Sequence, residues 1–158
     1  MYPKNHTCCF TGHRFIPPEQ ISPLASALEH AVTAQLDQGI FHFCTGGALG
    51  FDTLAAETLL HLRDRRSELR LTLVLRCRDQ ARRWTSEAAE RYQAILSQAN
   101  TVIYTGEHYS AGCMHRRNRF LVDHSAICIA YCTQNTGGTA YTVQYARQKN
   151  LPIIFLAP

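Results

Sequence analysis

The sequence predicts an α/β protein built on a mostly parallel sheet with helices on both faces. Short apolar segments alternate along the whole chain with segments whose apolar residues recur at helical spacing. Most of the short segments are continuously apolar, which is typical of strands that are buried on both faces. Strands that alternate with helices are joined by right-handed crossovers, and these place helices above and below a parallel sheet.

Six strands are expected, each with the length and apolar content of a buried strand. They are residues 7–10, 41–44, 69–75, 101–104, 125–131 and 153–156. The helices between them are marked by apolar stripes: Leu24, Leu28 and Val32; Leu54, Ala55 and Leu59; Tyr92, Ile95 and Leu96; Phe120 and Leu121; Val143 and Ala146. Gly39 is placed to end the first helix, and Thr85 or Ser86 is placed to begin the third.

The composition excludes several classes of protein. The 158 residues are expected to form one domain over residues 1–158, and 46% hydrophobic against 18% charged residues does not match a disordered chain. No apolar run approaches the roughly 20 residues that span a bilayer, and residues 1–10 lack the apolar core of a signal peptide. We therefore expect no membrane contact and a cytoplasmic location.

The cysteines and arginines bear on the kind of ligand. The seven cysteines are expected to be free thiols, and no two of them have the C-x-x-C spacing of a zinc site, so we expect no metal and no cofactor. The formal charge is +4, and fourteen of the sixteen basic residues are arginines, whose planar fork suits phosphate and carboxylate groups. Genomic base composition is a second interpretation of this bias, and charge alone does not establish nucleic-acid binding.

The residues that bear chemistry gather in loops that directly follow strands. In open α/β sheets ligands bind outside the carboxyl ends of the strands, so these loops form the candidate site. Glycines at the start of a helix let an anion approach backbone N–H groups at the positive helix end. The candidate ligand-binding residues in three such loops are Thr11, Gly12 and Arg14; Gly46, Gly47, Gly50 and Asp52; and Gly137, Gly138 and Thr139. Their spacing matches neither the dinucleotide fingerprint nor a Walker loop.

Several polar residues have a second interpretation. Asp52 is placed either to cap a helix or to bind a ribose hydroxyl, and Glu57 lies either on the solvent face of its helix or towards the site. Arg117 and Asn118 belong to a basic run that is either a ligand-binding turn or a solvated helix face. His13 directly follows a strand and is therefore expected near the crevice, although a surface position is the commoner one for a histidine.

The order of these motifs resembles the YpsA-type branch of the SLOG superfamily, which also contains the DNA-processing protein DprA and the LOG phosphoribohydrolases. The resemblance covers residues from about 8 to 155. It rests on Thr11-Gly12-His13-Arg14, Gly46-Gly47-Ala48-Leu49-Gly50-Phe51-Asp52 with Ala56-Glu57, Gln80 and Trp84, Arg91-Tyr92, Met114 with Arg117-Asn118-Arg119, and Gly137-Gly138-Thr139 with Tyr145-Ala146. It implies a Rossmann-like domain that binds a nucleotide or a nucleotide derivative.

The motif shared by the LOG enzymes, P-G-G-x-G-T-x-x-E, is incomplete in this chain. Aligning Gly137 and Gly138 with its glycine pair puts Ala140 at the third glycine and Gln144 at the glutamate. An amide cannot act as a general base, so the resemblance does not by itself imply catalysis. If the protein is an N-glycosidic hydrolase, the expected catalytic residues are Glu57 as acid or base and His13 as its helper.

Three functions follow, in order of preference. The first is a nucleotide-binding, sensor-like protein in which the glycine loops hold phosphate, Arg14 and Arg117 neutralise charge, and Trp84 covers the base. The second is a hydrolase of a nucleoside phosphate or of ADP-ribose. The third is DprA-like binding of single-stranded DNA through arginines and exposed aromatic residues such as Tyr104 and Tyr109. Homo-oligomerisation is expected only by analogy with LOG-type relatives.

Overall fold

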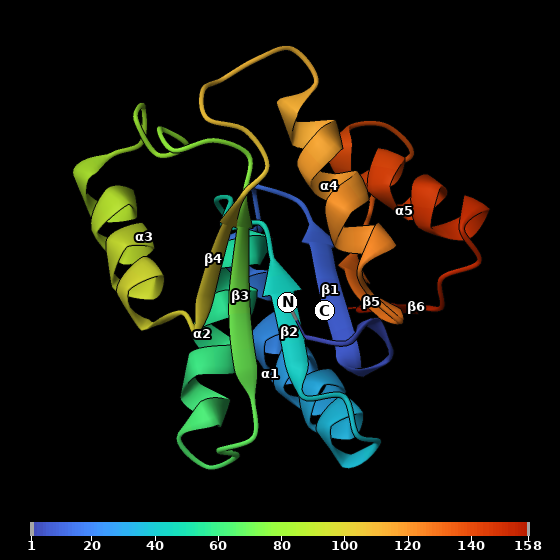
Figure 1. Cartoon of the computed structure of the whole chain (residues 1–158). Helices are drawn as coiled ribbons and strands as arrows, with labels where there is room; N and C mark the ends of the chain where they lie inside the picture. The colour runs from blue at the N-terminus through green and yellow to red at the C-terminus, as the bar shows by residue number, and fades with distance from the viewer. Residues whose placement is uncertain (1, 158) are drawn as a thin grey trace.

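The six expected strands form one parallel sheet in the computed structural model, which describes residues 2–157. The strands are β1 (Thr7–Gly12), β2 (His42–Thr45), β3 (Arg70–Leu75), β4 (Thr101–Tyr104), β5 (Ile127–Tyr131) and β6 (Ile153–Phe155). They lie in the order β4-β3-β2-β1-β5-β6, and each neighbouring pair is parallel (Figure 1). The predicted α/β class is confirmed.

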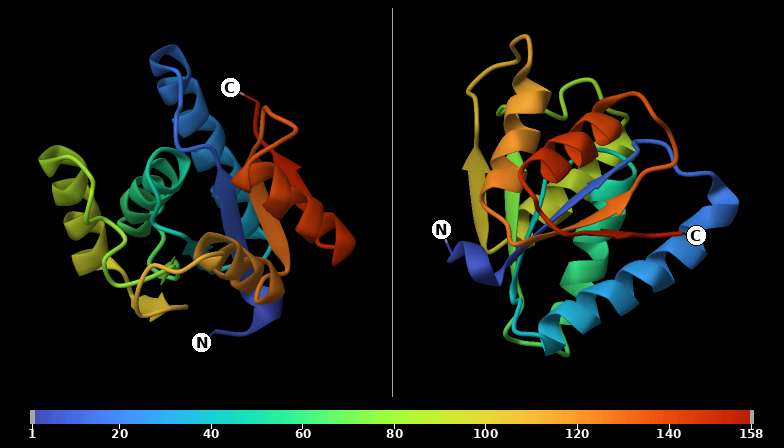
Figure 2. Two further views of the ribbon diagram at one scale, coloured as in Figure 1. Left: turned by 90° about the horizontal axis from the view of Figure 1, so that it is seen from above. Right: turned by 90° about the vertical axis from the view of Figure 1, so that its right-hand side faces the viewer.

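Five helices cover the two faces of this sheet. One face carries α1 (Pro18–Asp37), α2 (Phe51–Arg63) and α3 (Ser86–Gln98), and the other carries α4 (Cys113–Asp123) and α5 (Gly138–Gln148). Figure 2 shows the two groups of helices on opposite sides of the strands. The expected helix ends are also present: Gly39 follows α1 with φ +94°, and the Thr85 hydroxyl accepts a hydrogen bond from the N–H of Ala88 at 3.2 Å.

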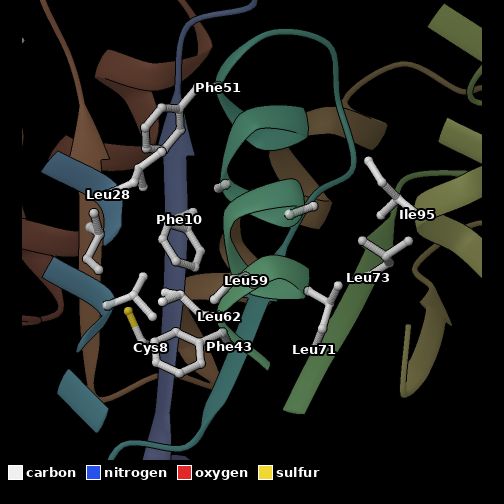
Figure 3. Packing of buried hydrophobic residues seen from close by; sticks show 14 of the residues in the cluster. Cys8, Phe10, Leu28, Phe43, Phe51, Leu59, Leu62, Leu71, Leu73 and Ile95 are labelled. Carbon is white, nitrogen blue, oxygen red and sulfur yellow. The ribbon is translucent and has the colours of Figure 1, made fainter. Parts of the chain in front are cut away.

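Two apolar clusters hold the layers together, one on each face of the sheet. The larger cluster packs Phe10 of β1 and Phe43 of β2 against Leu59 of α2 and the other helices of that face (Figure 3). The smaller cluster, under α4 and α5, contains three buried thiols, because Cys9 of β1 is in register with Cys44 of β2 and with Cys128 of β5. All seven cysteines are free thiols in the structure.

The path of the chain creates a crevice at the carboxyl ends of β1 and β5. These two strands are neighbours, but β1 leads into α1 on one face and β5 leads into α5 on the other. The loops after the two strands therefore diverge, which is the arrangement that places ligand sites in open α/β sheets. Among residues 2–157, no helix combines the length and hydropathy needed to cross a membrane.

Candidate functional site

A cleft of about 490 Å³ occupies this crevice, a volume within the range of small-molecule sites. Its walls come from the end of β1, the first turns of α2 and α4, and the loop that leads into α5. The left view of Figure 2 looks onto the edge of the sheet at which it opens. Ten of the predicted site residues line it: Thr11, Gly12, His13, Arg14, Asp52, Arg117, Asn118, Gly137, Gly138 and Thr139.

The N-terminal end of α5 is open towards this cleft. Gly137 precedes the helix with φ +97°, a conformation that favours glycine, and the first backbone hydrogen bond of the helix runs from Tyr141 N–H to the Gly137 carbonyl at 3.0 Å. The N–H groups before Tyr141 have no partner within a helix of this kind and carry its positive end. A Cβ atom added at Gly138 would meet no atom within 4 Å, so there is open space beside these donors.

The other predicted glycine loop, residues 46–50, leads into α2, and a carboxylate of the protein itself lies at the N-terminal end of that helix. The Asp52 carboxylate accepts a hydrogen bond from the N–H of Ala48 at 3.2 Å, and so occupies the position that an anion would take there. Gly46 lies against the Arg117 guanidinium, Gly47 against Leu75, and Gly50 against the backbone of Arg14. Of residues 46–50 only Ala48 lines the cleft, and the three glycines pack closely against neighbouring residues.

Asp52 and Arg117 are two buried side chains of opposite charge that line the cleft. Arg117 donates Nη1 to the Gly46 carbonyl at 2.5 Å and Nε to Asn118 Oδ1 at 2.9 Å. Burial raises the pKa of Asp52, and the charge of Arg117 acts against that rise; burial lowers the pKa of Arg117, and the charge of Asp52 acts against that fall. The opposite charges of Asp52 and Arg117 therefore offset part of the effect of burial on each other's pKa, while the ion pairs within 4.0 Å in residues 2–157 engage other side chains.

The predicted helix cap at Asp52 is wrong. α2 begins at Phe51 and the residue before it is Gly50, so Asp52 lies inside the first turn of the helix. Its carboxylate nevertheless remains near the positive helix end, since it reaches back to Ala48. The same residue lines the cleft, which leaves the alternative interpretation, contact with a ribose hydroxyl, geometrically open.

His13 is a neutral, oriented group at the wall of the cleft. Its Nε2 accepts a hydrogen bond from the N–H of Thr133 at 2.8 Å, which places the ring proton on Nδ1. The ring packs edge-on against Tyr131, with 5.4 Å between ring centroids. Burial lowers the pKa of His13, so the ring is uncharged at neutral pH.

Three groups at the cleft remain free to contact a ligand. Arg14 is exposed and forms no ion pair within residues 2–157; its guanidinium contacts Met114 Sδ at 3.4 Å. Asn118 uses Oδ1 for Arg117, which leaves its amide NH₂ available as a donor. Phe15 is 73% exposed at the same cleft. Sequence reasoning missed Phe15, because nothing in the local pattern separates it from a core phenylalanine.

Glu57 and Trp84 lie away from this cleft. The Glu57 carboxylate accepts two hydrogen bonds from Arg91, at 2.5 Å from Nη2 and 3.2 Å from Nε, in an ion pair that links α2 to α3. Trp84 packs edge-on against Tyr92 and lines a different cleft. The expected pairing of Glu57 with His13 is therefore not assembled. Within residues 2–157, no group of three or more His, Cys, Asp or Glu side chains is placed to hold a metal ion.

Comparison with known proteins identifies relatives over most of the chain. The family model of the YspA SLOG family matches residues 17–155. UPF0398 protein YpsA of Bacillus subtilis is 25% identical over 148 residues, which cover 84% of this chain and 78% of that protein.

Two solved structures share the fold. DNA processing protein A from Helicobacter pylori, studied for its single-stranded DNA binding mode, superposes with a TM-score of 0.70 at 18% identity over 96% of this chain. DprA from Streptococcus pneumoniae superposes with a TM-score of 0.72 at 16% identity over 99% of this chain. The match covers 65% of the first of those chains and 51% of the second, so this chain is similar to only part of each.

Proposed function

This chain belongs to the YspA SLOG family, and on that basis we propose that its cleft binds the phosphate of a nucleotide or nucleotide derivative. One observation carries the proposal. The open N-terminal end of α5, the unpaired Arg14 guanidinium and the exposed Phe15 ring all line the same cleft. A helix end and an arginine are complementary to phosphate, and an exposed aromatic ring is complementary to a base.

Each remaining group has a place in this proposal. The N–H groups of Gly138 and Thr139 bind phosphate oxygens, and Arg14 balances their charge. The free amide of Asn118 donates to the same phosphate or to the ribose. Asp52, whose negative charge faces the cleft, accepts hydrogen bonds from ribose hydroxyls, the role that acidic residues have in other nucleotide sites on related sheets.

The site supports binding without turnover better than hydrolysis. Among the described residues that line the cleft, Asp52 is the single carboxylate, and Glu57 is engaged by Arg91 elsewhere. Gln144, which stands where LOG enzymes have a glutamate, lines a separate hollow with Arg147 and Phe155. A hydrolase built on this cleft would therefore have to use Asp52 with His13, a combination that product analysis tests directly.

The first experiment is isothermal titration of the purified protein with AMP, ADP, ATP, NAD, ADP-ribose and a short single-stranded oligonucleotide. The decisive variant is Gly138→Asp, with Gly138→Asn as its control of equal size. A Cβ atom at Gly138 meets no atom within 4 Å, and an acidic residue in the first turn favours the helix. The aspartate repels phosphate, so we expect at least a tenfold loss of affinity in Gly138→Asp and a much smaller loss in Gly138→Asn.

Three outcomes would change the proposal. Equal binding of every nucleotide by Gly138→Asp and the parent would exclude phosphate from the α5 end. Free base or ribose phosphate, found by chromatography of the titrated mixtures, would make the protein a hydrolase. Binding of the oligonucleotide alone would favour the activity for which the Helicobacter pylori protein was studied.

A further inference from the structure

A second cleft, of about 590 Å³, lies on the other side of Arg14. Its wall is the segment of residues 76–84, which follows β3, and Tyr109 closes it from the segment between β4 and α4. Arg14 lines both this cleft and the cleft between β1 and β5. The two clefts are therefore neighbours at the carboxyl edge of the sheet, the edge seen in the left view of Figure 2.

The second cleft is strongly basic. It is lined by the arginines Arg14, Arg76, Arg82 and Arg83 and by one carboxylate, Asp79. In the part of the chain that the structure describes, the ion pairs within 4.0 Å engage other arginines and none of these four. Like charges gathered on a concave surface raise one another's energy and concentrate anions there. The positive charge of this cleft therefore favours an anionic ligand.

The wall of this cleft is a built structure that is tied to the first. Gln80 is buried, and its Oε1 accepts a hydrogen bond from the N–H of Arg76 at 3.0 Å. Its Nε2 donates to the Gly46 carbonyl at 3.0 Å, and the same carbonyl accepts from Arg117 at the base of the first cleft. One peptide oxygen thus fixes the position of both clefts relative to each other.

Aromatic faces accompany the arginines. Tyr109 is 69% exposed and lies beneath the Arg76 guanidinium, which is 5.5 Å from the centre of its ring. Trp84 is held on the other wall by its edge-on contact with Tyr92, at 5.1 Å between centroids. The first cleft likewise combines an anion-binding group with an exposed ring, Phe15. The two clefts therefore repeat one chemical pattern, an aromatic face beside a phosphate-binding group.

We infer that the second cleft binds a second phosphate-bearing end of the same ligand. The ligand class is then a nucleotide with two separated phosphate groups, one at the start of α5 and one among Arg76, Arg82 and Arg83. Arg14 lies between the two groups and contacts both. This inference rests on the proposed phosphate site of the first cleft and adds to it the size and charge of the ligand.

The test compares ligands with one and with two separated phosphates. AMP is titrated against adenosine 3′,5′-bisphosphate, NADP and the 5′-phosphorylated dinucleotide of deoxyadenosine, which represents a nucleic-acid source of the same chemistry. We expect at least one of the three to bind tenfold or more tightly than AMP. Arg82 and Arg83 are both exposed. In the variant Arg82→Gln/Arg83→Gln, the ratio of the affinity for that ligand to the affinity for AMP should fall to about one.

The control variant is Arg65→Gln/Arg66→Gln. It also removes two positive charges, but next to the C-terminal end of α2 and away from both clefts. It should keep the full ratio. The inference is overturned if the parent protein binds the ligands with two separated phosphates no more tightly than AMP. It is also overturned if the affinity ratio falls equally in both double variants. Suppose that AMP binds, that Gly138→Asp abolishes this binding, and that a second phosphate adds no affinity. That result would overturn this inference and leave the proposed function standing. If none of the ligands binds, the proposed function is overturned as well.

Discussion

The Arg117 guanidinium donates a hydrogen bond to the carbonyl oxygen of Gly46 at 2.5 Å, and so joins α4 to the loop that follows β2. A methyl group at Gly46 would collide with that guanidinium. The charge of Arg117 also acts against the rise that burial causes in the pKa of Asp52. One buried arginine thus holds the glycine loop closed and balances the only carboxylate among the described residues lining the cleft.

Replacing Arg117 by methionine should destabilise the protein strongly. The change removes a buried guanidinium whose charge acts against the burial of Asp52, and it takes one of two side-chain donors from the Gly46 carbonyl; leaving a buried polar group unsatisfied typically costs about 1–3 kcal/mol. The free energy of unfolding from urea titration is the measurement. Asp52→Asn added to Arg117→Met should recover part of the loss, because it removes the orphaned charge. A loss below about 1 kcal/mol in the single variant would show that the buried guanidinium is not required for stability.

Gly12→Ala should destabilise the fold even though Gly12 lies at the cleft. A Cβ atom at this position would overlap the buried ring of Phe51, so either the ring or the end of β1 has to move. Overpacking of this kind costs about 1–3 kcal/mol. Gly138→Ala is the matched control, since its Cβ meets nothing within 4 Å, and thermal unfolding should separate the two variants by several degrees. Equal midpoints would mean that Gly12 is not required for packing.

Glu57→Gln should leave nucleotide affinity unchanged. Glu57 and Arg91 are both partly exposed, at 41% and 52% of their side-chain surface, so their ion pair contributes less than about 1 kcal/mol to stability. Asp52→Asn, by contrast, changes a group that lines the cleft and should alter affinity. Titration of both variants with the same nucleotide makes the comparison. If Glu57→Gln lost nucleotide affinity tenfold and Asp52→Asn kept the parent affinity, the result would indicate a binding site nearer to α3.

The free energy of unfolding should fall in mild acid because of His42. The Thr7 hydroxyl donates to the Pro3 carbonyl, so it accepts from His42 Nδ1 at 2.9 Å, and His42 Nε2 accepts from the Thr72 hydroxyl at 2.6 Å. Burial lowers the pKa of His42 from 6.5 to about 4. The unfolded chain therefore binds more protons than the folded one between these values, so stability is complete above pH 6.5 and falls towards pH 4.

The expected slope of this effect is about 1.4 kcal/mol per pH unit within that window. Urea titrations of the parent and of His42→Gln at pH 7, 6 and 5 measure it. Other titrating groups contribute equally to both proteins, so the difference between the two pH profiles isolates His42. Parallel profiles would show that His42 keeps an ordinary pKa in the folded protein.

The sequence by itself determined the sheet, its helices and the edge that carries the cleft. Strand positions depend on local runs such as residues 7–10 and 153–156, in which apolar content is high enough to be decisive. The end of β1 and the Gly137–Gly138 turn could be brought together from sequence, because parallel strands all end at one edge.

Only the tertiary structure decided what the polar residues do there. Glu57 and Arg91 are 34 residues apart, and Arg117 and Gly46 are 71 apart, so no local pattern indicates that they meet. The glycines of residues 46–50 predict a phosphate-binding loop. In the folded chain the Asp52 carboxylate accepts a hydrogen bond from the Ala48 N–H of this loop. The second basic cleft depends in the same way on Tyr109 reaching the segment after β3. Periodicity reports which side of an element is buried, whereas partners and free charges depend on which distant side chains the packing brings into contact.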